Sequence, residues 1–234
     1  MIEISGLSKR FRSRAVLQRL DLTVRPGAVN LLVGANGAGK TTLLRIIAQL
    51  AAPDAGTVRI NGLDLGTEPL RALAQLSFLP QAPRFHPRLT TRQVAQYYGR
   101  LRRREPSAVD AELARWQLTD HLQVMTHQLS GGMRQRLALA VFALAHAPVL
   151  VLDEPGLSLD PFWREQLQQF LTDAAREGRT VLVATHLLGE WEGRVDACHH
   201  MQAGRIVGEL PPARLRAAFA EAEGLPLPDR EGIE

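Results

Sequence analysis

Residues 29–42 read Val29-Asn30-Leu31-Leu32-Val33, then Gly34-Ala35-Asn36-Gly37-Ala38-Gly39-Lys40-Thr41-Thr42. The first five form the apolar run of a buried β-strand. Residues 34–41 fit the pattern G-x-x-x-x-G-K-[ST]. From Thr41 to Leu50, leucines and isoleucines recur at helical spacing with no Gly or Pro between them. The sequence therefore predicts a strand, a glycine-rich loop and a helix, in that order.

This loop has the chemistry of a phosphate-binding site. Its glycines let the backbone curl so that consecutive N–H groups face an anion, and the helix N-terminus adds positive potential. Only two of the 28 basic residues are lysines, and Lys40, one of them, supplies a compact charge suited to phosphates. Thr41 offers a hydroxyl to Mg²⁺. The residues expected to contact the nucleotide here are Gly34, Ala35, Asn36, Gly37, Ala38, Gly39, Lys40, Thr41 and Thr42. A glycine-rich turn without a ligand is the alternative.

Two adjacent carboxylates follow a second buried strand. The apolar run Val149–Leu152 ends in Asp153 and Glu154. In a phosphate-transfer site Asp153 would hold Mg²⁺ through water, and Glu154 would polarise the attacking water. Two acids at a strand end could also be ordinary solvated loop residues, but the glycine loop favours the catalytic interpretation.

Composition narrows the class of protein. The 234 residues are 45% hydrophobic and 22% charged, which is typical of one folded α/β domain and excludes disorder as the main state. The most apolar stretch, residues 137–152, is interrupted by His146 and Pro148, so we expect no membrane span. A net charge of +4 does not require nucleic acid as a partner. The lone Cys198, and a start without signal-peptide features, favour the cytoplasm.

Strand and helix patterns alternate on both sides of a helical segment. The predicted strands are residues 2–4, 16–24, 29–33, 57–60, 77–79, 149–152, 180–184 and 206–208. Helical patterns cover residues 41–50, 91–101, 107–116, 132–145 and 162–175. Such alternation with fully apolar strands predicts a parallel sheet covered on both faces. After Pro211 we expect a short Ala/Arg-rich helix and then a poorly ordered end rich in Pro, Gly and acidic residues.

The run Leu129-Ser130-Gly131-Gly132-Met133-Arg134-Gln135-Arg136 adds a second anion site. Ser130 is a helix N-cap, and Gly131 and Gly132 open the helix, so a hydroxyl and backbone N–H groups can face an anion. With the motifs above, residues 2–210 closely resemble the ATP-binding-cassette (ABC) transporter ATPases, whose signature is LSGGQ followed by a basic stretch. A helix N-cap without a ligand is the alternative.

The resemblance implies a fold and a domain division. The fold is α/β, a P-loop NTPase core of the RecA-like type with a mainly parallel sheet, an N-terminal antiparallel β subdomain and an inserted α-helical subdomain. Residues 1–210 form a single ABC ATPase domain. Its core covers residues 1–81 and 148–210, its helical subdomain with the signature covers residues 82–147, and residues 211–234 form a tail.

The resemblance also assigns roles to four residues outside these motifs. Phe11 resembles the aromatic that stacks on adenine, Gln81 the loop glutamine that senses Mg²⁺ and water, and His186 the histidine that contacts the γ-phosphate. Asp160 resembles the last residue of the loop that crosses the dimer interface, but Leu157 stands where the family usually has a small polar residue. The alternatives are a half-buried strand aromatic for Phe11, a generic loop amide for Gln81 and a structural histidine for His186.

Together these features predict an ATP-hydrolysing subunit that drives transport through a separate membrane-spanning subunit. The cofactors are ATP and Mg²⁺, with Thr41, Gln81 and Asp153 around the metal. Ser130–Gly132 would meet nucleotide bound to a paired subunit, so the ATPase is expected to be a head-to-tail homodimer or a pair with a related chain. The permease would dock near residues 81–98, on the cytoplasmic face of the inner membrane.

Gly132-Met133-Arg134-Gln135-Arg136 with Leu159-Asp160-Pro161 resembles the compact ATPases of ABC-2-type exporters. The alternative function is a soluble ABC-type ATPase that acts on nucleic acid or ribosomes. Such proteins generally carry two cassettes or a long coiled coil before the signature, whereas here only 90 positions (130 minus 40) separate Lys40 from Ser130.

Overall fold

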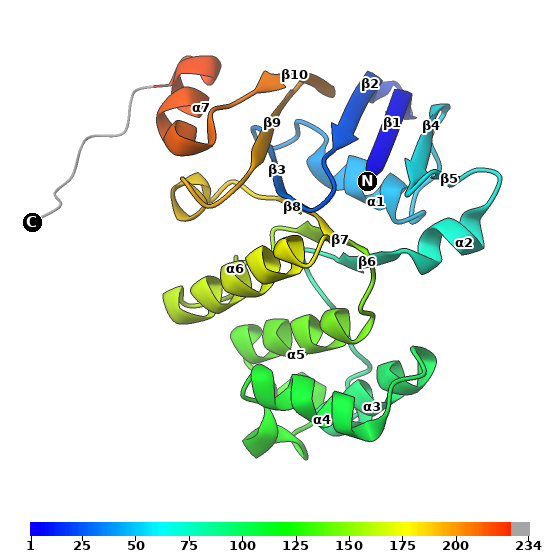
Figure 1. Cartoon of the computed structure of the whole chain (residues 1–234), viewed down its shortest axis with the longest axis vertical. Coiled ribbons are helices and arrows are strands. Elements are labelled where there is room, and N and C mark those ends of the chain that lie inside the picture. The colour runs from blue at the N-terminus through cyan, green and yellow to red at the C-terminus, as the bar shows by residue number, and fades with distance from the viewer. Residues whose placement is uncertain (226–234) are drawn as a thin grey trace, which may run out of the picture.

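The chain folds into two β-sheets with helices packed around them, and the computed structural model describes residues 1–225 (Figure 1). The first sheet is antiparallel, with strands in the order β2-β1-β4-β5. These strands are β1 (Ile2–Phe11), β2 (Arg14–Val24), β4 (Ala55–Ile60) and β5 (Leu63–Asp64). β4 and β5 are joined by a turn at Asn61 and Gly62, both with positive φ, as this dipeptide predicts.

The second sheet has six strands in the order β10-β9-β3-β8-β7-β6. All neighbours run parallel except β9 and β10, which form an antiparallel pair. The strands are β3 (Val29–Val33), β6 (Leu76–Leu79), β7 (Val149–Asp153), β8 (Thr180–Ala184), β9 (Ala197–Gln202) and β10 (Arg205–Glu209). Every residue of β3, β7 and β8 is buried, as expected for central strands covered on both faces.

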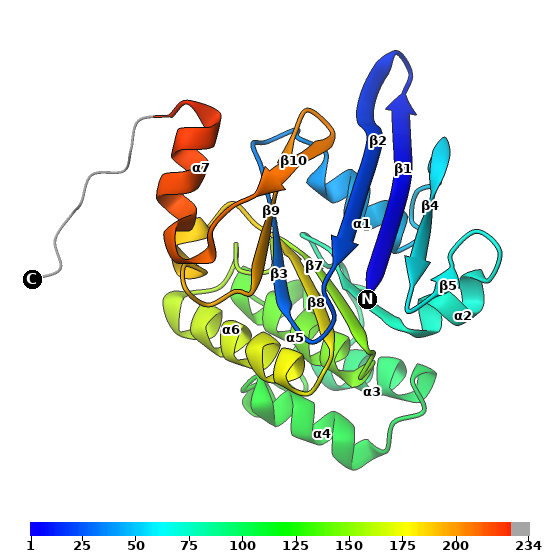
Figure 2. The same ribbon diagram turned by 45° about the horizontal axis from the view of Figure 1, so that its top comes forward.

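Helices fill the space between and beside the sheets (Figure 2). They are α1 (Lys40–Ile47), α2 (Pro69–Ala74), α3 (Thr91–Leu101), α4 (Pro106–Arg115), α5 (Gly131–Leu144), α6 (Pro161–Arg176) and α7 (Leu215–Glu223). Leu43 and Ile46 of α1 join Ile2 and Ile60 of the first sheet in one apolar core. α5 and α6 contribute to a second core on the other face of the parallel sheet. None of the helices in residues 1–225 combines the length and the apolar composition that a bilayer crossing requires.

Between β6 and β7 the chain is helical, as predicted. α3 has the predicted bounds, and α4 and α5 each lie within one residue of theirs. Short 3₁₀ turns at Thr119–His121 and Thr126–Gln128 connect α4 to α5. α3 begins at a capping box, in which Thr90 accepts from the Gln93 N–H and the Gln93 side chain accepts from the Thr90 N–H.

The ranges predicted from the sequence omit three of these helices and strands. β5 has only two residues, too few for a strand pattern to be seen. α2 has six residues, too few for a helical period to be seen, and begins with Pro69 at its first turn. β9 reads Ala-Cys-His-His-Met-Gln, where His199 and His200 break the apolar pattern although both are buried. The Ala/Arg-rich helix predicted after Pro211 is present as α7, and its first residue, Leu215, is fully buried. The end that we expected to be poorly ordered, from residue 226 on, lies outside the described residues.

Candidate functional site

The glycine loop connects β3 to α1 and fits tightly against neighbouring backbone. A Cβ added at Gly34 would lie 2.1 Å from the Met201 carbonyl oxygen. One added at Gly39 would lie 3.0 Å from the Val16 carbonyl oxygen, and the φ of Gly39 is +113°. Only glycine tolerates both the close approach and the positive φ. Gly39 is also the N-cap of α1 and has no side chain to satisfy the free N–H groups of the first turn, which are therefore available to an anion.

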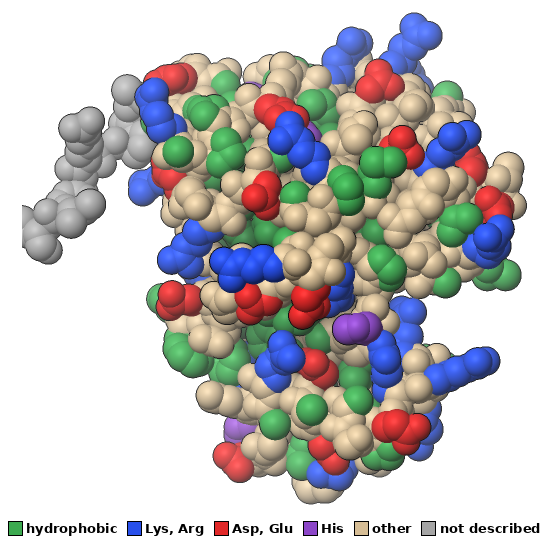
Figure 3. Space-filling model, viewed as in Figure 1, with side chains coloured by type: hydrophobic (Ala, Val, Ile, Leu, Met, Phe, Trp, Pro, Cys, Tyr) green, Lys and Arg blue, Asp and Glu red, His purple; other side chains and the backbone are tan. Residues whose placement is uncertain are grey.

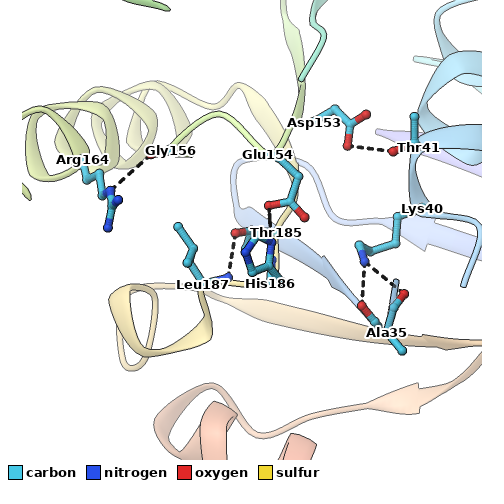
Figure 4. A network of polar contacts seen from close by, with 11 residues as sticks. Ala35, Lys40, Thr41, Asp153, Glu154, Gly156, Arg164, Thr185, His186 and Leu187 are labelled. Atoms are coloured by element: carbon cyan, nitrogen blue, oxygen red, sulfur yellow. Dashed lines mark hydrogen bonds and ion pairs between the residues drawn. The ribbon is translucent and has the colours of Figure 1, made fainter. Parts of the chain in front are cut away.

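Lys40, the first residue of α1, folds back over this loop. Its Nζ donates to the carbonyl oxygens of Gly34, at 2.6 Å, and Ala35, at 3.4 Å (Figure 4). Burial lowers the pKa of Lys40, while the charges of Glu154 and Asp153 act in the opposite direction. The loop thus holds a desolvated ammonium group, a favourable partner for the oxygens of a polyphosphate.

Thr41 lies against the end of β7. Its Oγ1 is 3.3 Å from Oδ1 of Asp153, the last residue of that strand. The Asp153 side chain is buried, and burial raises its pKa; the nearby charge of Glu154 adds to the rise, whereas the hydrogen bond from Thr41 opposes it. A hydroxyl and a carboxylate are the hard oxygen ligands that Mg²⁺ prefers, so the donor set fits this cation.

Glu154 and His186 meet where β7 and β8 end. Oε2 of Glu154 is 2.9 Å from Nδ1 of His186 and accepts at 3.3 Å from the backbone N–H of His186. Thr185 stabilises the turn after β8, because its Oγ1 accepts from the backbone N–H of Leu187 at 3.1 Å. Figure 4 shows Glu154 lying between His186 and the pair formed by Thr41 and Asp153. The strand order β3-β8-β7 therefore brings the ends of three neighbouring strands, and the groups that follow them, to one edge of the sheet.

A cavity of about 430 Å³ lies over the glycine loop. It brings together Phe11 and Gln81, which are far apart in the sequence, with the loop and Glu154. Its lining residues are Phe11, Arg14, Val16, Asn36, Gly37, Ala38, Gly39, Lys40, Thr41, Thr42, Gln81 and Glu154. The Phe11 side chain is 51% exposed, and its ring lies 5.3 Å from Nζ of Lys9. The ring is thus accessible for stacking.

The signature residues lie apart from that cavity. Ser130 caps α5, with its Oγ accepting from the Met133 N–H at 3.2 Å, and Asp160 caps α6, with its Oδ1 accepting from the Trp163 N–H at 3.1 Å. Gly132 packs against the loop before α6, where an added Cβ would lie 3.1 Å from the Ser158 carbonyl oxygen. Ser130, Gly131, Gly132 and Asp160 thus form a second cluster, and none of them lines the cavity over the glycine loop.

Sequence reasoning missed three residues near the site. Arg14 and Val16 of β2 line the main cavity. Phe219 of α7 lines a smaller cavity of about 170 Å³ together with His186 and the start of the glycine loop. They lie far from the glycine loop in the sequence, so no local motif could reveal them. The alternating pattern of β2 and the helical pattern of α7 predicted only secondary structure.

Comparison with known proteins gives one consistent result. A family model described as "ABC transporter" matches residues 17–156. The chain is 36% identical over 220 residues to a daunorubicin resistance ATP-binding protein, DrrA3, of Streptomyces coeruleorubidus, covering 92% of this chain and 70% of that protein. It is 31% identical over 215 residues to the Nod factor export ATP-binding protein I of Rhizobium etli, covering 90% and 68%. None of these findings supports the nucleic-acid alternative.

Solved structures agree on the fold. A structure described as the ATP-binding subunit of an ABC transporter superposes with a TM-score of 0.84 at 25% identity, covering 96% of this chain and 94% of that one. A dimeric ATP-binding cassette in a post-hydrolysis state, bound to ADP and Pi, also gives 0.84 at 23% identity, covering 91% and 99%. The predicted fold class, an antiparallel sheet beside a mainly parallel P-loop sheet with helices, is confirmed.

Proposed function

The chain belongs to the ABC transporter family as an ATP-binding and ATP-hydrolysing subunit, and on this premise we propose how its residues hold and cleave ATP. The phosphates lie in the glycine loop, residues 34–42, and the adenine stacks on Phe11. The observation that carries the proposal is the convergence of Lys40, Thr41, Asp153 and Glu154 at one edge of the parallel sheet, around an open cavity.

Mg²⁺ would be held by Thr41 and Asp153, with Gln81 at the cavity wall. The donor set supports this, because Asp153 is a buried carboxylate that Thr41 already contacts. When bound, the cation neutralises charge on the terminal phosphates. It also relieves the cost of burying the Asp153 charge, which is the cause of that residue's raised pKa.

In phosphoryl transfer the protein acts mainly by placing charged groups around the terminal phosphate, and it forms no covalent bond with the substrate. Lys40 exchanges the carbonyl oxygens of Gly34 and Ala35 for phosphate oxygens. Glu154 accepts the hydrogen bond of the attacking water and polarises it. Because Glu154 also contacts the ring and the backbone N–H of His186, it fixes where His186 can meet the terminal phosphate.

The second half of the site comes from a paired subunit. Ser130, Gly131 and Gly132 present a helix N-terminus suited to an anion but lie apart from the glycine loop of their own chain. We assign them to nucleotide bound by a second copy, or by a related chain, arranged head to tail. Asp160, the N-cap of α6, lies in the loop that would cross between the two subunits.

A membrane-spanning partner would dock between the sheets and helices α3–α5. Figure 3 shows the surface hollowed there. A groove of about 190 Å³ in this region is lined by residues of β6, of the loop after it, of α3 and of α5, among them Pro83, Phe85 and Tyr98. The segment 81–98 thus offers an apolar floor beside Gln81. Docking here would place the chain on the cytoplasmic face of the membrane.

Transport is proposed to run outward. Two relatives are named for daunorubicin resistance and for Nod factor export, and the motifs resemble those of ABC-2-type exporters. The cargo itself contacts the membrane subunit, so nothing in this chain specifies it.

Glu154→Gln tests the assignment. We expect nucleotide to bind as in the parental chain while turnover falls by about 100-fold or more, because the water loses its general base. Nucleotide affinity from a fluorescent ATP analogue and phosphate release at saturating Mg·ATP measure the two quantities. Parental turnover in this variant would show that Glu154 is not the water-orienting residue.

A further inference from the structure

The backbone of Glu154 has an unfavourable conformation. Its φ is +48°, in the left-handed region that residues with a Cβ seldom adopt. The backbone N–H of Glu154 donates to the Ala184 carbonyl oxygen at 2.8 Å, which ties this residue to the end of β8. Such a conformation persists only where surrounding contacts hold it, and it is typical of functional sites.

A second contact at this turn is made by the signature helix. Gln135 of α5 is 3% exposed, and its Nε2 donates to the carbonyl oxygen of Pro155 at 2.9 Å. Pro155 directly follows Glu154 in the sequence. Glu154 is thus held on one side through its own N–H, by β8, and on the other side through the carbonyl of the next residue, by a buried amide. Removing the amide would leave a buried carbonyl unsatisfied, which is costly.

Helix α5 is the fixed partner in this contact. Leu137 and Leu139 are fully buried in the main core. The next side chain, Arg136, donates from Nη1 to the Trp116 carbonyl oxygen at 3.1 Å, and its guanidinium lies 4.5 Å from the centre of the Trp163 ring. A helix anchored in this way keeps its position when the loop after β7 moves. Loss of the Gln135 hydrogen bond should therefore increase the mobility of that loop and not that of α5.

We propose that Gln135 is a positioning residue for Glu154. From the signature helix, its amide holds the Pro155 carbonyl, and so keeps the Glu154 carboxylate facing the phosphate cavity. The proposal rests on the assigned role of Glu154 as the water-polarising residue. It also means that α5 serves two ATP sites. Its N-cap, Ser130, faces the nucleotide of the paired subunit, and its Gln135 positions Glu154 of its own chain.

The test replaces the amide with a side chain of similar size that cannot donate, Gln135→Met. A control is Gln168→Met, because Gln168 is also buried, at 5% exposure, and donates from Nε2 to a backbone carbonyl, that of Glu190, at 2.9 Å. Since Gln168 Oε1 also accepts from Arg194, this control removes at least as much hydrogen bonding as Gln135→Met, but away from Glu154. We expect kcat of Gln135→Met to fall about 10- to 100-fold, since small misplacements of catalytic groups cost that much. Nucleotide affinity should stay within about twofold in both variants, because the glycine loop is unchanged, and kcat of Gln168→Met should stay within about threefold.

Amide hydrogen exchange of the nucleotide-free full chain supplies a readout independent of turnover. Gln135→Met should exchange faster in residues 156–160 and at parental rates in residues 137–144, while Gln168→Met leaves both segments unchanged. Parental kcat in Gln135→Met, an equal loss of kcat in the two variants, or faster exchange of the helix itself would overturn the proposal. If Glu154→Gln also turns over normally, the proposed function fails; if only Gln135→Met does, the positioning role alone fails.

Discussion

The two edges of the parallel sheet carry cavities of different character. At the edge where β3 and β9 begin, a cavity of about 540 Å³ is lined by Glu165, Gln168, Arg194 and Asp196 among others. Several of its polar groups are engaged in holding the fold. Arg194 donates to Gln168 Oε1 at 2.6 Å, and Asp196 Oδ2 accepts from the Val29 N–H at 2.7 Å. This cavity is larger than the one over the glycine loop.

The cavity at the opposite edge, over the glycine loop, is smaller, but charged side chains there are buried at an electrostatic cost. Burial lowers the pKa of Lys40 and raises that of Asp153, so both charged forms are disfavoured by the fold alone. Groups kept in such a state at a cavity are typical of functional sites, because a ligand of the right charge can relieve them. The comparison teaches that unfavourable charge, more than cavity size, distinguishes the candidate site.

The largest effect on nucleotide binding is expected from Lys40→Ala, which removes one of these buried charges. Removing a charged hydrogen bond of about 1.5–3 kcal/mol should weaken nucleotide binding by roughly 10- to 100-fold. The control is Arg59→Ala, because Arg59 is a basic residue that pairs with Asp64 and does not line the cavity over the glycine loop. Titration with a fluorescent ATP analogue measures both variants. Equal affinities for Lys40→Ala and the parental chain would contradict the role assigned to Lys40.

The next change, Asp153→Asn, is expected to have a modest effect on stability in addition to its effect on turnover. In the nucleotide-free chain this change removes a desolvated charge, so it should raise the melting temperature at neutral pH while abolishing Mg²⁺-dependent turnover. Since the folded-state pKa of Asp153 is raised, its contribution to stability is fully present below the unfolded-state pKa and is lost as pH rises through the folded-state pKa.

The advantage of the asparagine variant should therefore be greatest above that raised folded-state pKa and should vanish in acid, where Asp153 is protonated. Thermal unfolding across this range, with and without Mg·ATP, provides the measurement. An asparagine variant that melts below the parental chain at neutral pH without nucleotide would contradict the strain argument.

The smallest effects are expected at the other edge of the sheet. Glu165→Gln and Arg176→Gln alter charged residues of α6 that line the larger cavity. Both should leave nucleotide affinity and kcat within about twofold of the parental values, because surface substitutions away from a site change little. A tenfold change in either quantity would show that cavity size, and not unfavourable charge, was the better guide.

Much of the candidate site could be predicted because its residues lie in contiguous sequence motifs. The glycine loop, Lys40 and Thr41 lie at one strand-to-helix junction, and Asp153 and Glu154 directly follow a fully apolar strand. Local spacing fixes the chemistry of such segments, so reading them needs no tertiary information. The helices between β6 and β7 were equally predictable from their periodic apolar residues.

The rest depended on contacts between distant segments. The order β10-β9-β3-β8-β7-β6 places β3 between two strands more than 140 residues further along the chain, and no local pattern encodes that arrangement. Gln135 could be recognised as part of the signature run, but its hydrogen bond to Pro155 exists only once α5 packs against the parallel sheet. The same holds for Phe219, which lines a cavity together with residues of the glycine loop only because of where α7 packs.

If two chains complete each ATP site, as proposed, nucleotide should change the oligomeric state of the Glu154→Gln variant. Light scattering after size exclusion should give the mass of one chain without nucleotide and of two chains with Mg·ATP. Adding Ser130→Arg to the same variant should prevent pairing while leaving nucleotide bound, because the arginine would obstruct the helix N-terminus that meets the partner's phosphates. A Glu154→Gln protein that stays a single chain with ATP bound, or that still pairs when Ser130 is replaced, would contradict the account.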